Sequence, residues 1–120
     1  MDYVYDNQNI FAKILRGEIP NQTVYENEHA LAFNDINAQA PVHVLVIPKG
    51  PYVSMDHFCQ HASEAEVVGF MRAVGKVCKM SGVDAGFRAI SNARAEGGQE
   101  VPHLHIHILG GRAMGPMLAT

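Results

Sequence analysis

Residues 101–111 carry the pattern that most constrains the fold, because three histidines alternate there with aliphatic residues. Successive side chains of a β-strand point to opposite faces of its sheet, so the alternation predicts a strand with one imidazole face and one core face. The imidazole face would carry His103, His105 and His107, and the core face Leu104, Ile106 and Ile108. A single histidine on an exposed strand face is an ordinary polar residue. Three at strict spacing, followed by Gly110 and Gly111, indicate chemistry, because imidazole serves as a nucleophile, an acid or base, or a metal ligand near neutral pH.

Apolar runs predict four further strands, at residues 23–26, 30–33, 42–47 and 87–92. A short helix is expected at residues 10–15, before Gly17 and Pro20, and a long helix from the capping box that begins at Ser63 to the left-handed C-cap Gly82. The long helix should turn these residues to the core: Val67, Phe70, Met71, Val74, Val77 and Cys78. Residues 49–58 are predicted to form an irregular connection and residues 93–99 a polar loop. The fold class is therefore α+β, with a mainly antiparallel five-stranded sheet, one long helix and one short helix.

Length and charge restrict the class of protein. A chain of 120 residues is expected to form one domain. Its net charge of −3 provides no basic surface of the kind that binds nucleic acid. No apolar run approaches the roughly 20 residues that span a bilayer, and the acidic N-terminus does not resemble a signal peptide. Two cysteines without a Cys-x-x-Cys motif indicate neither a disulfide framework nor a cysteine zinc site. We therefore expect a cytoplasmic protein with no nucleic-acid or membrane partner.

A glycine-containing loop precedes the histidines. Gly97 and Gly98 have no Cβ, so the backbone can approach a ligand closely and donate N–H groups to an anion. Asn92, just before this loop, can hydrogen-bond a phosphate oxygen or a leaving group, and it is equally suited to a turn. Together these residues indicate a phosphate cradle next to the imidazoles.

The histidine spacing alone leaves two chemistries open. One imidazole can attack an electrophilic phosphorus while its neighbours orient it and stabilise charge. Alternatively, three neutral imidazoles can hold a zinc ion that activates water. The nearest carboxylates in the sequence, Glu96 and Glu100, give the zinc hypothesis no particular support as orienting partners.

Several collinear segments resemble the histidine triad (HIT) family, and specifically its HINT-like branch of nucleotide-binding hydrolases. The family signature is His-φ-His-φ-His-φ-φ, where φ is an apolar residue, and residues 103–109 match every position. The other matching segments are residues 10–20, 33–36, 39–41, 43–49, 97–99 and 110–112. We expect a flexible N-terminal arm at residues 1–8. The resemblance implies a HIT domain at residues 9–114, followed by a C-terminal tail at residues 115–120.

The resemblance also implies a mechanism. The middle histidine, His105, would attack the α-phosphorus of a nucleoside monophosphate derivative, and water would hydrolyse the nucleotidyl-histidine intermediate. His107 would contact the phosphate oxygens or the leaving-group side, and His103 would hold the geometry of the nucleophile. His43 resembles the fourth active-site histidine of the family, although a buried structural histidine is the alternative on this central strand.

A nucleoside pocket is implied in the same way. Asp35 corresponds to the acid that accepts hydrogen bonds from ribose hydroxyls, which suits a carboxylate with two acceptor oxygens. The backbone around Gln99, Glu100 and Val101 would close over the phosphate, and Asn92 belongs to the same nucleotide-binding set. The apolar residues that would enclose the base are Ile10, Phe11, Ile14, Ile36 and Leu45. Relatives in this branch form homodimers with a sheet continued across the two-fold axis, and we expect the same here.

This chain departs from the family at several positions. Asn9 and Ala12 stand where many bacterial relatives have cysteines that bind a structural zinc, so we expect no such zinc here. The implied mechanism is metal-independent, and we expect no metal and no cofactor. Glu100 replaces the serine found in some relatives, Asn34 stands where a histidine is common, and the tail has no tryptophan. The resemblance implies hydrolysis of the P–N bond in purine nucleoside 5′-phosphoramidates of the adenosine type. The alternatives are a dinucleoside polyphosphate hydrolase and a purine nucleotide-binding or scaffold protein with incidental hydrolysis.

Overall fold

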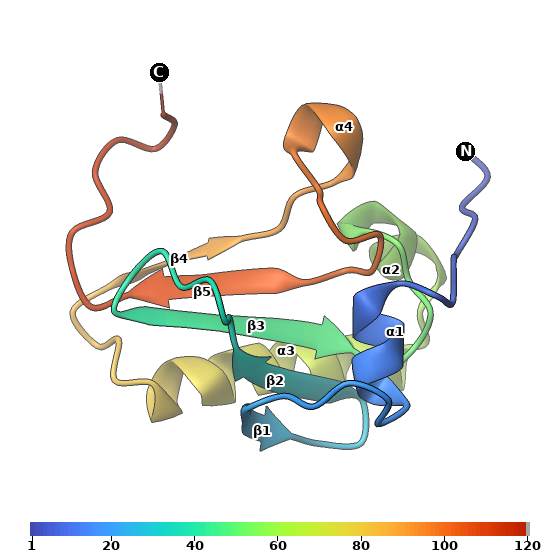
Figure 1. Ribbon diagram of the computed structural model, residues 1–120, viewed down its shortest axis with the longest axis horizontal. Helices are drawn as coiled ribbons and strands as arrows, with labels where there is room; N and C mark the ends of the chain where they lie inside the picture. Colours follow the sequence, from blue (N-terminus) through green and yellow to red (C-terminus); the bar gives the residue numbers. More distant parts are fainter. Residues whose placement is uncertain (120) are drawn as a thin grey trace.

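The computed structural model describes residues 1–119; Thr120, the last residue of the expected tail, lies outside them. The strands are β1 (Thr23–Glu26), β2 (Ala30–Asn34), β3 (Val42–Pro48), β4 (Phe87–Ile90) and β5 (Ile106–Gly110). The helices are α1 (Ile10–Leu15), α2 (Met55–His61), α3 (Glu64–Met80) and α4 (Arg94–Gly97). All neighbouring strands pair antiparallel, in the order β1-β2-β3-β5-β4, so the predicted α+β class and five-stranded sheet are confirmed (Figure 1).

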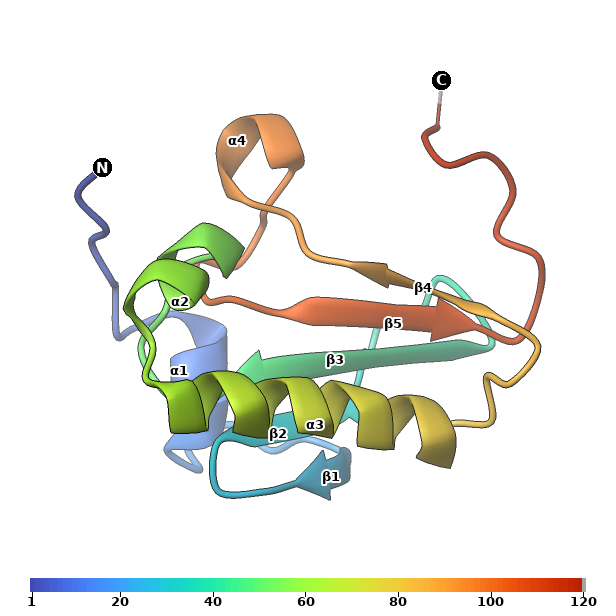
Figure 2. The ribbon, with the colours of Figure 1, turned by 180° about the vertical axis from the view of Figure 1, so that it is seen from behind.

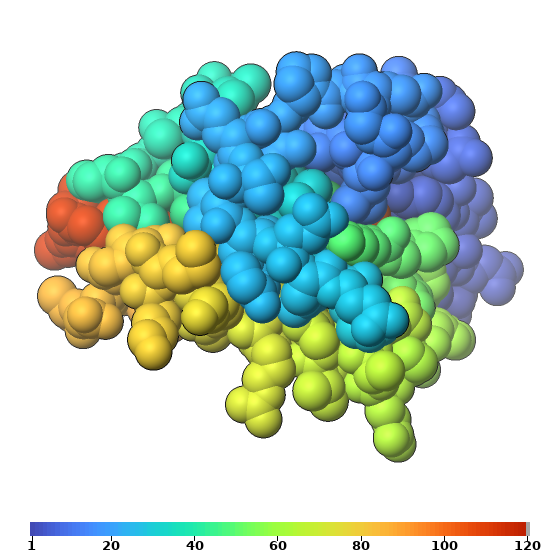
Figure 3. Space-filling view, turned by 90° about the horizontal axis from the view of Figure 1, so that it is seen from below, coloured from blue at the N-terminus to red at the C-terminus, as the bar shows by residue number. Residues whose placement is uncertain are grey.

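The two faces of the sheet are covered unequally. The long helix α3 crosses one face, where Phe70, Ala73 and Val77 are fully buried (Figure 2). The six-residue helix α1 contributes Phe11 and Ile14 to a smaller core on the other face. Seen from below, the β1–β2 hairpin lies between the N-terminal segment and α3 (Figure 3). Because α1 is short, part of its face of the sheet stays open, and His105 and His107 lie there.

Strand alternation decides which side chains reach the open face. On β3, Val44 and Val46 belong to the core under α3, whereas Leu45 and Ile47 belong to the core under α1. On and before β5, Leu104, Ile106 and Ile108 are buried in the α3 core, as the alternation predicts. Leu45 pairs with His107 across the β3–β5 ladder. The period of two therefore places the odd-numbered residues of both central strands toward α1.

The long helix confirms most of its predicted features. The Ser63 side chain accepts a hydrogen bond from the N–H of Glu66, whose carboxylate in turn accepts one from the N–H of Ser63. Gly82 has φ +69°, so it supplies the left-handed residue just after the helix. Met71 was expected in the core, and this expectation is wrong: its side chain is 51% exposed. Helical spacing predicts the side of the helix on which a side chain lies, but it does not predict whether another element of the chain packs over that side chain.

Two segments expected to be irregular contain helices. Residues 49–58 were predicted to be a connection, but α2 begins at Met55 and is held by Phe58, which packs edge-on against Tyr52 and Phe70. One buried side chain gives no periodic signal, so the pattern could not indicate this helix. Residues 93–99 contain the single turn α4, which ends at Gly98 with φ +75°. The expected pair of helices is thus a set of four in the part of the chain that the structure describes.

The histidine strand is shorter than predicted. β5 begins at Ile106, so only His107 of the three histidines belongs to the sheet. Pro102 has no N–H, the N–H of His103 donates to the carbonyl of Val101, and the N–H of Leu104 donates to Tyr52. Those bonds replace the sheet ladder before Ile106. No helix among residues 1–119 is long and apolar enough to cross a membrane.

Candidate active site

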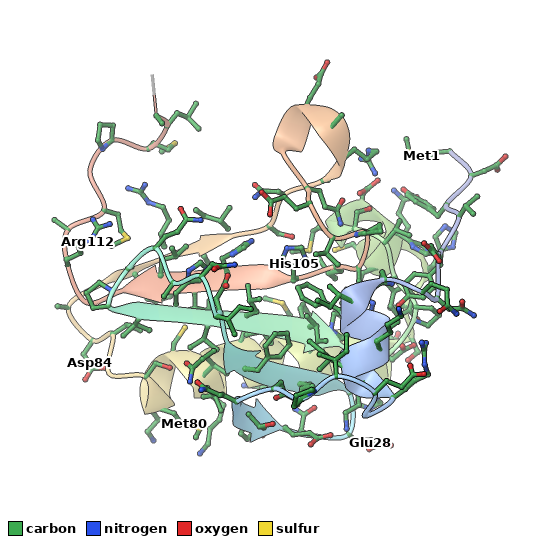
Figure 4. The ribbon with its side chains drawn as sticks, in the orientation of Figure 1. Met1, Glu28, Met80, Asp84, His105 and Arg112 are labelled. Atoms are coloured by element: carbon green, nitrogen blue, oxygen red, sulfur yellow. The ribbon has the colours of Figure 1, made fainter. Side chains whose placement is uncertain are left out.

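A cavity of about 350 Å³ opens on the α1 side of the sheet. It lies between α1, the end of β2 and the residues that lead into β5, and both His105 and His107 line it. Figure 4 shows His105 where the chain enters β5, on the side of the sheet on which α1 lies. Of the predicted nucleotide-binding residues, all but Gln99 line this cavity: Ile10, Phe11, Ile14, Asp35, Ile36, Leu45, Asn92, Glu100 and Val101.

Hydrogen bonds assign the protons of His105. Its Nδ1 lies 2.7 Å from the backbone carbonyl of His103, and a carbonyl can only accept, so Nδ1 carries the proton. The other ring nitrogen, Nε2, therefore keeps its lone pair. The ring packs edge-on against Phe11 and His107, with both centroid separations 4.9 Å. The result is a neutral imidazole, held in one orientation and 6% exposed, with an unprotonated nitrogen available to a ligand.

His107 is oriented by a second histidine. The backbone N–H of Gln39 donates to Nδ1 of His43 (3.1 Å), so the proton of a neutral His43 is on Nε2. That Nε2 donates to Nδ1 of His107 at 2.9 Å, and it also lies 3.3 Å from Oδ2 of Asp35. His107 then carries its own proton on Nε2, which can donate to an anionic ligand in the cavity. His43 does not line the cavity; it acts from behind the residues that do.

His103 also lies behind the cavity and is completely buried. Its Nε2 donates to the carbonyl of Pro48 (2.9 Å), and the hydroxyl of Tyr5 donates to its Nδ1 (2.6 Å). Both ring nitrogens are thus occupied, and the backbone carbonyl of His103 accepts the His105 proton. His103 therefore lies before β5 with its ring turned away from the cavity, although both its ring and that of His105 contact Phe11.

Burial controls the electrostatics of these rings. Loss of solvent lowers the pKa of His103 to about 4 and that of His107 to about 4, since a buried imidazole pays a desolvation cost for its charge. Burial also lowers the pKa of His105, while its bond to the His103 carbonyl and the charges of Asp35 and Glu100 oppose the shift. At neutral pH all three triad histidines are therefore uncharged.

The nitrogens of the triad do not suit a shared metal ion. His103 has both ring nitrogens engaged, so the three imidazoles cannot converge on one ion as the zinc hypothesis requires. Asp35, His43 and His107 do bring three potential ligand atoms within 4.8 Å of one another. However, Nε2 of His43 carries a proton and points at His107, so it has no lone pair to offer. This cluster is organised for hydrogen bonding.

The apolar part of the cavity combines buried and exposed residues. Phe11, Ile14 and Leu45 form its floor, whereas Ile10 is 46% and Ile36 is 90% exposed at its mouth. The exposed Ile36 side chain at the rim and the buried apolar floor together favour a flat apolar ligand that lies between the rim and the floor. The carboxylate of Asp35 lies at the same mouth and accepts the N–H of Asn37 through Oδ1.

Gln99 has a different position from its neighbours. Its side-chain amide donates to the carbonyls of Val53 and Val101, and its Oε1 accepts the N–H of Arg94. The N–H groups of Gly98 and Gln99 donate to carbonyls of α4. The expected cradle therefore has two of its backbone donors engaged in ending α4, and Gln99 fixes the loop from behind. Gly98, Glu100 and Val101 are the members of this segment that line the cavity.

Three contacts of the site were not predicted. Tyr5 belongs to the arm, Gln39 acts through its backbone, and Ser91 donates to the carbonyl of His105 (3.1 Å). The arm has no periodicity, and a backbone donor leaves no residue-type signal, so neither contact could be found from pattern. Ser91 lies in a predicted strand, but nothing in the sequence indicates its partner.

Known proteins resemble this chain over nearly its whole length. The family model for the HIT domain matches residues 16–114. An uncharacterized 13.2 kDa HIT-like protein of Azospirillum brasilense is 57% identical, covering 98% of each chain. The purine nucleoside phosphoramidase of Escherichia coli is 42% identical over 93% of this chain and 94% of its own. A histidine triad protein of Clostridium difficile has a solved structure with a TM-score of 0.82 and 43% identity, covering 94% of this chain and 98% of its own. The sheet, the histidine arrangement and these matches agree that the chain belongs to the HIT family.

Proposed function

We propose that this protein hydrolyses the P–N bond of purine nucleoside 5′-phosphoramidates through a nucleotide covalently bound to His105. The observation that carries the proposal is the tautomer of His105: its Nδ1 proton is held by the His103 carbonyl, which leaves the Nε2 lone pair for the cavity. A neutral imidazole with a fixed lone pair is the form that attacks an electrophile. The 42% identity to the phosphoramidase of Escherichia coli supports the choice of substrate.

The proposed reaction has two displacements at phosphorus. In the first, Nε2 of His105 forms a bond to the α-phosphorus while the P–N bond breaks, and the amine leaves with a proton taken from solvent, which the attacking water of the second displacement gives back. In the second, water attacks the phosphorus, the bond to His105 breaks, and the nucleoside monophosphate is released. The neutral imidazole is then restored, so no cofactor is consumed.

The other cavity residues have corresponding roles in this proposal. The Nε2–H of His107 donates to a phosphate oxygen, and its orientation depends on His43. Asp35 accepts hydrogen bonds from the ribose hydroxyls, and the five apolar residues enclose the base: Ile10, Phe11, Ile14, Ile36 and Leu45. Asn92 and the backbone of Glu100 and Val101 contact the phosphate side, with Gln99 holding that loop. Burial, which lowers the pKa of His105, supports the scheme, because the nucleophile then needs no base to deprotonate it at neutral pH.

We also infer that the protein works as a homodimer. Strand β4 is an edge of the sheet, and Phe87 at its start is 49% exposed. On helix α3, Met71 and Met80 are each 51% exposed. A sheet edge with an exposed aromatic side chain, on a molecule with further exposed apolar side chains, favours pairing with a second copy, which would continue the sheet.

The test is mass spectrometry of the protein after brief mixing with an adenosine 5′-phosphoramidate, quenched without acid. An adduct of the mass of adenosine monophosphate on His105, absent in His105→Gly, is the expected result. If neither an adduct nor released monophosphate is detected, hydrolysis is contradicted and the nucleotide-binding alternative is favoured. Parallel assays with dinucleoside polyphosphates distinguish the second hydrolase alternative by comparing kcat/KM between the two substrate classes.

A further inference from the structure

The N-terminal arm makes specific contacts with the domain. Tyr3 stacks on His57 of α2 with ring centroids 4.3 Å apart and planes inclined by 8°. Its hydroxyl donates to Oδ2 of Asp56 at 2.7 Å, and the same carboxylate pairs with Arg94 of α4. Arm residues 1–4 line one cavity together with Gln99, Glu100 and Pro102. The arm therefore lies beside the segment that leads into the histidines.

Tyr5 extends from this anchored arm to the triad. Its hydroxyl donates to Nδ1 of His103 at 2.6 Å, and its ring meets that imidazole edge-on at 5.6 Å. On the opposite side of the ring, Nε2 of His103 donates to the carbonyl of Pro48. The His103 imidazole is thus clamped between the arm and the end of β3. The family model matches residues 16–114, so Tyr5 lies outside the matched region.

The position of His103 bears directly on the nucleophile. Its backbone carbonyl accepts the Nδ1 proton of His105, and this bond fixes the tautomer of that ring and, together with the contacts to Phe11 and His107, its rotation. Residues 103–105 precede β5 and lack the support of the sheet ladder. The backbone there depends on a few separate bonds, and the clamped ring of His103 is one of the attachments that hold its carbonyl in place. A shift of this carbonyl would break the hydrogen bond that fixes the tautomer of His105.

We propose that Tyr5 is a positioning residue of the active site, acting through His103 to hold His105 in its reactive orientation. The inference rests on the proposed function, in that His105 is the nucleophile. Tyr5 does not line the cavity and does not contact the reacting groups. Loss of its hydroxyl should therefore affect the alignment of His105 and leave substrate binding unchanged. The arm thereby becomes a part of the catalytic unit that no pattern around the histidines indicates.

The experiment compares Tyr5→Phe with wild type and with Tyr25→Phe, a matched loss of a tyrosine hydroxyl on β1, whose ring packs against the core on the α3 face. Turnover of an adenosine phosphoramidate is measured together with hydrogen exchange of the His105 Nδ1–H by nuclear magnetic resonance. In Tyr5→Phe, kcat should fall about tenfold, the rate equivalent of one disrupted buried hydrogen bond, with KM within about twofold of wild type. Exchange of the Nδ1–H should accelerate by a similar factor, and Tyr25→Phe should match wild type in both measurements.

Two results would overturn the proposal. One is a Tyr5→Phe variant with wild-type kcat and wild-type exchange. The other is a variant that unfolds more readily yet keeps the wild-type kcat per folded molecule, because Tyr5 would then be structural only. If wild type itself does not turn over the substrate, the proposed function fails, and the exchange of the His105 proton still decides whether Tyr5 holds that ring.

Discussion

Nε2 of His43 lies 2.9 Å from Nδ1 of His107, and this bond couples a buried histidine of β3 to one that faces the cavity. Because the Gln39 N–H occupies the opposite nitrogen of His43, the proton direction is set, and His107 presents its remaining N–H to the ligand. His43→Ala should therefore lower kcat by about 10–100-fold, the rate equivalent of a lost buried hydrogen bond, with a smaller effect on KM. Steady-state kinetics with an adenosine phosphoramidate measure this. His29→Gln, which changes a histidine near the hairpin turn, is the control, and equal losses in both variants would contradict the coupling.

His105→Ala should abolish turnover and leave nucleotide affinity nearly intact. The substitution removes the attacking nitrogen, whereas the apolar floor and Asp35 remain in place. Isothermal titration with adenosine monophosphate gives the affinity, and a phosphoramidate assay gives the rate. Near-normal turnover by this variant would rule out the covalent mechanism.

Asp35→Ala should chiefly weaken nucleoside affinity. A carboxylate that accepts two ribose hydroxyls contributes about 1.5–3 kcal/mol, so Kd for adenosine monophosphate is expected to rise by about 10–100-fold. The 3.3 Å approach to His43 gives Asp35 a second contact, and a modest change in kcat can accompany the loss. A binding titration against both adenosine monophosphate and its 2′,3′-dideoxy analogue separates the two effects. A variant that still discriminates fully between those ligands would argue against ribose recognition by Asp35.

The alternation of apolar residues predicts the sheet and the direction of its side chains well. Periods of two and 3.6 residues are direct consequences of backbone geometry, so β1, β2, β3 and the long helix were found at or within two residues of their ends. The same alternation placed His43 on the face of Leu45 and Ile47. The alternation does not show that His103 lies before the start of β5. The N–H groups of His103 and Leu104 donate to the carbonyls of Val101 and Tyr52, and these carbonyls belong to irregular backbone that no residue pattern indicates.

The site was predicted in its residue types more fully than in its geometry. The resemblance to the HIT family singled out the residues that line the cavity, including the exposed Ile36. The tautomers, by contrast, depend on the carbonyls of His103 and Pro48 and on the N–H of Gln39. Backbone groups are the same at every position, so no sequence pattern can identify which of them a side chain meets.

The dimer inference predicts a solution mass twice the 13.1 kDa of one chain, measured by light scattering after size exclusion. Phe87→Asp should shift the protein toward the monomer, because a charge at the β4 edge would be buried without a partner. Val4→Asp places the same charge on the arm, where the side chain is 83% exposed, and should leave the mass unchanged. A wild-type monomer at all concentrations would contradict the inference.

Stability should fall with acid in a window that the buried histidines define. The pKa of His103 is about 4 in the folded chain, below the ordinary value near 6.5, so between these values the unfolded chain binds the extra proton. Protonation then favours unfolding: the contribution of His103 is fully present above pH 6.5 and decreases by up to about 1.4 kcal/mol per pH unit toward pH 4. Urea denaturation across pH 4–8 measures the slope, to which the lowered pKa of His107 also contributes. His103→Gln should reduce the slope and His29→Gln should preserve it, whereas a His103→Gln slope equal to that of wild type would show that the buried ring already binds a proton in the native state.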